Sequence, residues 1–100
     1  MSKSKKDIIK DNIKKIKMKP GYKFMYKDYY NYPAKDYKEI NNYFKDYNKE
    51  LNRKDVLFIL KRIPNTTEYQ PIIYAKTPEG LKAALRFVSD YGWFEYELID

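Results

Sequence analysis

Lysine side chains at helical spacing are the residues of this sequence with the clearest chemical use, which is to neutralise an anion. Ile8, Ile9, Ile13 and Ile16 fall on one side of a helix in residues 1–19. The other side is almost entirely lysine: Lys5, Lys6, Lys10, Lys14 and Lys17. Because lysine contacts phosphate as a point charge, this pattern predicts a helix that neutralises the phosphates of a polyanion.

A second polar row lies in residues 35–51, opposite an apolar stripe. It consists of Lys38, Asn41, Asn42, Lys45 and Lys49. Asparagine can read adenine in the major groove of DNA, and lysine can reach phosphate or guanine. The same row is also typical of an ordinary solvated helix face, and both interpretations remain open.

The segment YKFMYKDYYNYP, residues 22–33, combines six rings with two lysines. Tyr22, Phe24 and Tyr26 alternate with Lys23, Met25 and Lys27, which predicts a strand whose rings share the core face. Tyr29, Tyr30 and Tyr32 fall beyond the alternation, in a loop closed by Pro33. Exposed tyrosines beside lysines can stack on bases or anchor a protein partner, so Tyr29 and Tyr30 join the candidate residues.

The positive charge lies in the first half of the chain. Residues 1–50 carry 14 lysines against 7 acids, whereas residues 51–100 carry 7 basic and 7 acidic residues. Residues 90–100 hold four acids and no base. This division predicts an anionic partner for the N-terminal half, DNA or RNA. A composition rich in Lys, Ile, Asn and Tyr is also typical of AT-rich genomes, as in viruses and mobile elements.

Several kinds of chemistry are excluded by residue types. The chain has no cysteine and no histidine, so it has no disulfide, no thiolate metal site and no Ser-His or Cys-His nucleophile. Its three glycines cannot form a glycine-rich phosphate loop. We therefore expect no enzyme activity, no metal and no cofactor. The longest apolar run, residues 56–60, is too short for a membrane span, and a cytoplasmic location without membrane contact is expected.

The elements that must position these residues follow from periodicity and turn signals. Pro20-Gly21 is expected to end the first helix, and Thr77-Pro78 to begin the last one, which Gly92 ends. The expected strands are residues 22–27, 55–63, 69–76 and 93–99, and the second helix is residues 35–51. The predicted organisation is a basic N-terminal helix, 1–19, and a single α+β domain, 20–100.

The order of elements over residues 22–99, β-α-β-β-α-β, resembles the ferredoxin-like sandwich, with a four-stranded antiparallel sheet and two helices. The segments YKEINNYFKDY, DVLFILKRI and PIIYAKTPEGLKAALRF resemble the RNA-recognition-motif domain in layout. That family stacks bases on rings of its third strand, where this chain has only Tyr74, so the stacking motif is absent. Some ferredoxin-like nucleases place a metal-binding acid after the first strand, which would be Asp28 here.

The alternative fold is a winged helix, with residues 35–51 as the recognition helix and residues 64–68 as the tip of the wing. The expected function is that of a small basic nucleic-acid-binding protein of a virus or mobile element. The alternative is a non-enzymatic viral inhibitor or adaptor that binds a host protein through its tyrosines and its acidic end. A homodimer is expected if the open sheet face is not covered by the isoleucines of residues 8–16.

Overall fold

The computed structural model describes residues 5–27 and 31–90, with side chains from Asp7 onward. The elements in chain order are α1 (Lys5–Lys14), β1 (Phe24–Lys27), β2 (Tyr32–Pro33), η1 (Ala34–Asp36), α2 (Tyr37–Leu51), β3 (Val56–Arg62), β4 (Glu68–Ala75) and α3 (Pro78–Ser89). The predicted α+β class is confirmed. The strand expected at residues 93–99 lies outside the described residues, as do Asp28, Tyr29, Tyr30 and Gly92.

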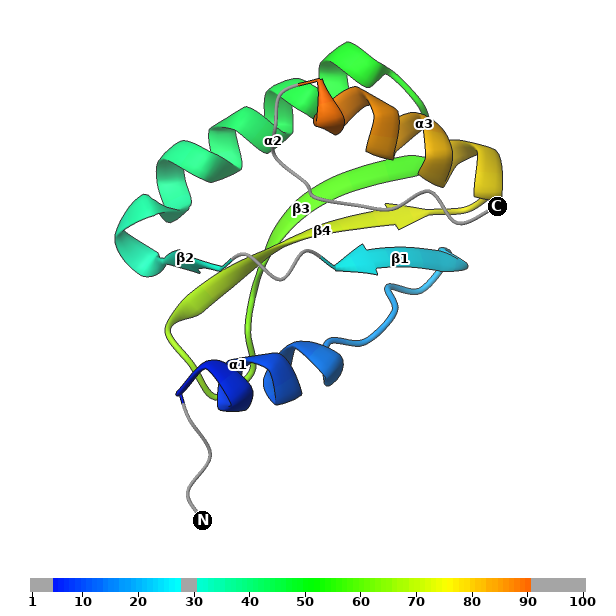
Figure 1. Cartoon of the computed structure of the whole chain (residues 1–100). Helices are drawn as coiled ribbons and strands as arrows, with labels where there is room; N and C mark the ends of the chain where they lie inside the picture. Colours follow the sequence, from blue (N-terminus) through cyan, green and yellow to red (C-terminus); the bar gives the residue numbers. More distant parts are fainter. Residues whose placement is uncertain (1–4, 28–30, 91–100) are drawn as a thin grey trace.

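The sheet is antiparallel and is organised around β4 (Figure 1). β3 pairs with β4 along its whole length, from Val56 opposite Ala75 to Arg62 opposite Tyr69. The other side of β4 is shared by β1, which pairs with residues 72–75, and by β2, which pairs with Glu68 and Tyr69. β1 and β2 therefore form one interrupted edge, so that the expected loop at Tyr32 is in fact a short strand.

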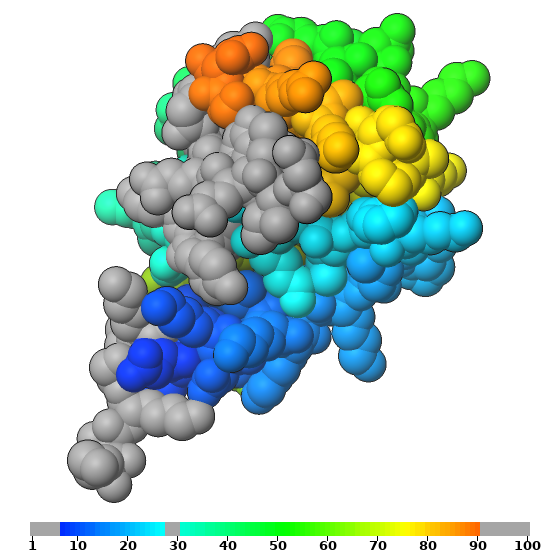
Figure 2. All heavy atoms as spheres, turned by 45° about the vertical axis from the view of Figure 1, so that its right-hand side comes forward, coloured from blue at the N-terminus to red at the C-terminus, as the bar shows by residue number. Residues whose placement is uncertain are grey.

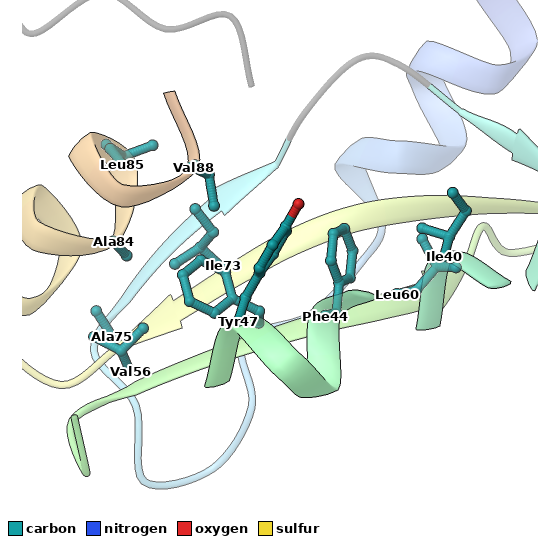
Figure 3. Close-up of a cluster of buried hydrophobic side chains, with 11 residues drawn as sticks. Ile40, Phe44, Tyr47, Val56, Leu60, Ile73, Ala75, Ala84, Leu85 and Val88 are labelled. Atoms are coloured by element: carbon teal, nitrogen blue, oxygen red, sulfur yellow. The ribbon is translucent and has the colours of Figure 1, made fainter. Parts of the chain in front are cut away.

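Helices cover both faces of this sheet (Figure 1). α2 and α3 lie on one face, over a core that includes Phe44, Tyr47, Phe58 and Ile73. Figure 3 shows Phe44 and Tyr47 of α2 gathered with Ile73 of β4 and with Val88 of α3. α1 lies on the opposite face, so α1 and α2 do not pack together as the helices of a helix-turn-helix do.

The two large helices form where local signals place them. The predicted stripe on α2 is confirmed, because Ile40, Phe44 and Tyr47 are buried. Asn52, with a φ of 51°, provides the left-handed residue that ends this helix. α3 begins at the predicted cap, where Thr77 Oγ1 accepts a hydrogen bond from Gly80 N–H at 3.0 Å.

A proline in the central strand would normally remove a ladder hydrogen bond. Ile63 N–H donates to Glu68 O, and Lys76 N–H donates to Asp55 O. Backbone groups alternate in direction along a strand, so these bonds show that the N–H and C=O groups of the even-numbered residues of β4 point toward β3. The backbone nitrogen of Pro71 therefore points away from β3, at a position between the parts of β4 that pair with β1 and with β2. The hydrogen bonds between β3 and β4 therefore do not need a donor at Pro71.

Two details of the N-terminal region differ from the prediction. α1 ends at Lys14, well before Pro20. Tyr22 does not share a face with Phe24 and Tyr26, which pack against the core under α2 and α3. Tyr22 packs instead on the α1 side, because its N–H donates to Lys19 O and so keeps it in the turn that precedes β1.

The second sheet face is closed by α1 and the residues after it. Ile13 and Ile16 are 1% and 4% exposed, and Ile16 packs with Ile72 and Tyr74 of β4. The isoleucine side of residues 8–16 therefore acts as the expected cover, although Ile8 itself stays 46% exposed. Tyr74 is the one ring that the resemblance in layout placed at a base-stacking position of the RNA-recognition motif. It is only 1% exposed, because α1 and the residues after it cover it.

Candidate nucleic-acid interface

The predicted interface residues fall into two sets, one on or near α1 and the other on α2, and these two helices cover opposite faces of the sheet (Figure 1). One set belongs to α1, the turn after it and β1: Lys10, Lys14, Lys17, Lys23 and Lys27. The other belongs to α2: Lys38, Asn41, Asn42, Lys45 and Lys49. The side chains of Lys5 and Lys6 and all of Tyr29 and Tyr30 lie outside the description. The predicted residues therefore do not form one continuous surface.

The α2 set is balanced by acids on the same helix. Residues 35–50 carry four lysines and four acids, so this segment has no net charge. Lys38, Asn42, Lys45 and Lys49 are exposed, as expected for a solvated helix face. A surface without net charge attracts phosphate weakly, which favours the solvated-face interpretation of this row.

All residues of the α1 set except Lys10 lie in an acid-free stretch of chain. From residue 12 to residue 27 the sequence has six lysines and no aspartate or glutamate. We call these lysines the basic face: Lys14, Lys15, Lys17, Lys19, Lys23 and Lys27. Figure 2 shows α1 and the residues after it as one continuous blue region beside the cyan atoms of β1. Lys15 and Lys19 are not among the predicted residues, although the acid-free run itself could have indicated them.

The side chains of the basic face are available to an external anion. Five of the six lysines are exposed, and Lys27 is half-buried. Within residues 7–27 and 31–90, no ion pair involves any of the six. Lys27 Nζ lies 3.5 Å from Lys14 O at the C-terminal end of α1, and burial lowers the pKa of this ammonium group. Six like charges with no acid between them in the sequence repel one another, and a bound polyanion would relieve that repulsion.

Hydrogen bonds and ring contacts hold this segment against the sheet. Tyr74 Oη donates to Lys17 O at 3.1 Å, and Lys61 Nζ donates to Tyr74 Oη at 3.4 Å. Tyr22 packs on Tyr74 with ring centroids 5.8 Å apart. Lys76 Nζ lies 5.5 Å from the centroid of the Tyr22 ring, which is the range of a cation–π contact. The basic face is therefore backed by a fixed platform that includes two further lysines.

A cluster of hydrogen-bonded side chains around Asp55 stabilises the fold. Arg53 Nε and Nη2 donate to the two Asp55 carboxylate oxygens at 2.9 and 3.0 Å, and Thr77 Oγ1 donates to Asp55 Oδ2 at 2.9 Å. These hydrogen bonds, that from Arg53 first, lower the pKa of Asp55 to about 2. The cluster ties the start of β3 to the first turn of α3.

No group of three or more acidic, histidine or cysteine residues that could hold a metal occurs among the described residues. None of the helices in that part of the chain is long and apolar enough to cross a membrane.

Comparison with protein-family models, curated proteins and solved structures returns no match to this chain. The candidate interface is thus defined by its own charge and geometry.

Proposed function

We propose that this protein binds nucleic acid, and that the basic face contacts the phosphate backbone. One observation carries this proposal: six lysines stand on a fixed segment with no acid between residues 12 and 27 and no ion pair to another described residue. Lysine ammonium groups bind phosphate as point charges and carry no base information. The binding through this face is therefore independent of sequence and driven by counterion release.

A finer fold assignment accompanies the function. We propose that the chain has the ferredoxin-like topology, with residues 93–99 as a fourth strand. This is supported by the order β1, β4, β3 in the described sheet, in which two parallel strands flank an antiparallel one. Three strands of the ferredoxin-like sheet have that order. Amide exchange in residues 93–99 tests the assignment, since a paired strand there should be protected and an unpaired segment should exchange at once.

The test of function is a salt series with labelled oligonucleotides. Fluorescence anisotropy should be measured with single- and double-stranded 20-mers of DNA and RNA at 50, 100 and 200 mM salt. If all six lysines contact phosphates, the logarithm of the binding constant should fall against the logarithm of salt with a slope of about −4 for single strands and about −5 for duplexes. Binding that ignores salt would reject the proposal.

The alternative expectation is a non-enzymatic inhibitor or adaptor that binds a host protein. It would replace nucleic-acid binding if the chain bound none of the oligonucleotides and instead captured one stoichiometric protein from a nuclease-treated extract. The nuclease step separates the two functions, because a complex held together by nucleic acid would be lost in it.

A further inference from the structure

A second binding feature lies at the other end of α1, where its first turns approach the turn between β3 and β4. A cavity of about 400 Å³ opens there between apolar and polar walls. Ile8 and Ile9 of α1 form the apolar wall, and Arg62, Asn65, Thr67 and Glu68 belong to the turn and the strand ends beside it. This volume is in the range of small-molecule and cofactor sites.

Two opposite charges share this cavity without pairing. Arg62 Nε donates to Thr66 O at 2.7 Å, which fixes one side of the guanidinium and leaves its terminal nitrogens to other partners. Neither Arg62 nor Glu68 forms an ion pair with any residue in the described ranges, which means that no N···O distance is 4.0 Å or shorter. The backbone of Glu68 is itself fixed, since its N–H donates to Thr66 Oγ1 and its carbonyl accepts from Ile63 N–H.

We propose that this cavity binds one unpaired guanine of the nucleic acid, an inference that rests on the proposed function. Guanine presents acceptors at O6 and N7, which match the guanidinium of Arg62, and donors at N1 and N2, which match the carboxylate of Glu68. Because Arg62 and Glu68 do not pair with each other, both remain available to the two edges of the base, and Ile8 and Ile9 offer a surface for the ring face.

The charge pattern disfavours the other bases. Adenine places a donor at N6, toward an arginine that can only donate, and thymine has an N3–H donor between its two carbonyl groups. Unpaired cytosine has adjacent acceptors at O2 and N3, but it offers the carboxylate only its N4 amino group in place of the two donors, N1 and N2, of guanine. In a duplex, the N1 and N2 groups of guanine are paired with cytosine, so the base must be single-stranded or turned out of the helix. Lys10 and Lys14 continue from the cavity along α1, so the phosphates beside the base can reach the basic face.

The test compares thymine 12-mers that carry at their centre guanine, inosine, adenine or a further thymine. Inosine lacks only the 2-amino group, which is a donor to Glu68 in the proposed complex. In fluorescence anisotropy, we expect the guanine oligonucleotide to bind about tenfold more tightly than the thymine or adenine ones, and several-fold more tightly than the inosine one.

Two variants test which side chain contacts which edge of the guanine base. Glu68→Gln should remove the difference between guanine and inosine, and Arg62→Gln should reduce the preference for guanine over adenine. The matched controls, Glu79→Gln and Arg86→Gln, change exposed residues of α3 on the other side of the sheet and should keep the wild-type ratios. Circular dichroism confirms that each variant folds. The ratios of the wild-type protein test the inference even if a variant does not fold.

The outcomes separate the inference from the function on which it rests. Equal, salt-dependent binding of all four oligonucleotides by the wild-type protein would overturn the guanine site and leave backbone binding in place. No binding of any oligonucleotide would overturn both.

Discussion

Removing three lysines from the basic face should weaken nucleic-acid binding far more than removing three from α2. The first variant replaces Lys15, Lys17 and Lys19 by glutamine, and the second replaces Lys38, Lys45 and Lys49. All six side chains are exposed, and none of them forms a side-chain hydrogen bond or ion pair with another described residue. Both variants lower the formal net charge from +7 to +4, so only the position of the lost charge differs.

The size of the effect follows from the number of phosphate contacts. With six contacts to a single strand, raising salt from 50 to 200 mM should weaken wild-type binding about 300-fold. The basic-face variant keeps three contacts, and its loss over the same range should be about 20-fold. The α2 variant should retain the wild-type dependence, because its lysines lie on the opposite face of the sheet.

The assay is anisotropy of a labelled single-stranded 20-mer over five salt concentrations, with thermal unfolding of each variant as a check of the fold. The comparison of slopes is decisive, because slopes count contacts and are less sensitive than affinities to small changes in stability. Equal slopes for the two triple variants would show that binding depends on total charge and not on the basic face. A larger loss of affinity in the α2 variant would show that the interface lies on α2 and not on the basic face.

Three further predictions concern stability. Asn48 Nδ2 donates to Phe58 O at 3.0 Å, and Phe58 N–H donates to Asn48 Oδ1 at 2.7 Å. Asn48→Ala should therefore lower the free energy of unfolding, measured by urea denaturation, by about 2 kcal/mol. The control Asn42→Ala, on the exposed side of the same helix, should lower it by about 0.5 kcal/mol or less. Gln70 is wholly buried, and neither polar atom of its side-chain amide has a hydrogen-bond partner in residues 5–27 and 31–90. Gln70→Leu should therefore raise the unfolding free energy by about 1 kcal/mol, and a lower value would contradict this account. The pKa of Asp55 is about 2 in the folded state and higher in the unfolded chain. The stability that Asp55 contributes is therefore present above about pH 4 and is lost as the pH falls toward 2. Asp55→Asn should make the free energy of unfolding, measured by urea denaturation, less dependent on pH in this acid range.

Local signals in the sequence were sufficient for the larger elements. The stripe from Tyr37 to Leu51 gives α2 because residues three and four apart share a helix face, whatever lies beneath them. Thr77 followed by Pro78 predicts the start of α3 because a cap needs only its own helix. The position of Tyr22, which was wrong, depends on contacts that the alternation does not encode. Tyr22 follows the strand alternation in sequence, but its bond to Lys19 O and its contact with Tyr74 place it on the other face.

The candidate site was predicted in part for the same reason. The lysines of α1 and α2 could be found by periodicity, but periodicity does not say that the two helices cover opposite faces of one sheet. Pairing of Tyr32 with Tyr69, which makes β2, joins residues far apart in the chain. The cavity that contains Arg62 and Glu68 likewise exists only because the turn between β3 and β4 meets α1. Such juxtapositions carry no local pattern in the sequence.

The distribution of acids bears on whether the lysine excess is functional or only compositional. A bias in codon usage raises lysine, asparagine and tyrosine wherever they are tolerated, and α2 shows that outcome, since its segment has as many acids as lysines. The same bias does not remove aspartate and glutamate from residues 12–27, a stretch that also has exposed positions where an acid would fit. Exchanging Lys17 and Lys19 for glutamate would therefore be compatible with the fold, since both are exposed and lie after the end of α1, but should abolish binding at 200 mM salt. A folded variant with such a substitution that still bound nucleic acid with the wild-type salt slope would leave composition as the explanation of the basic face.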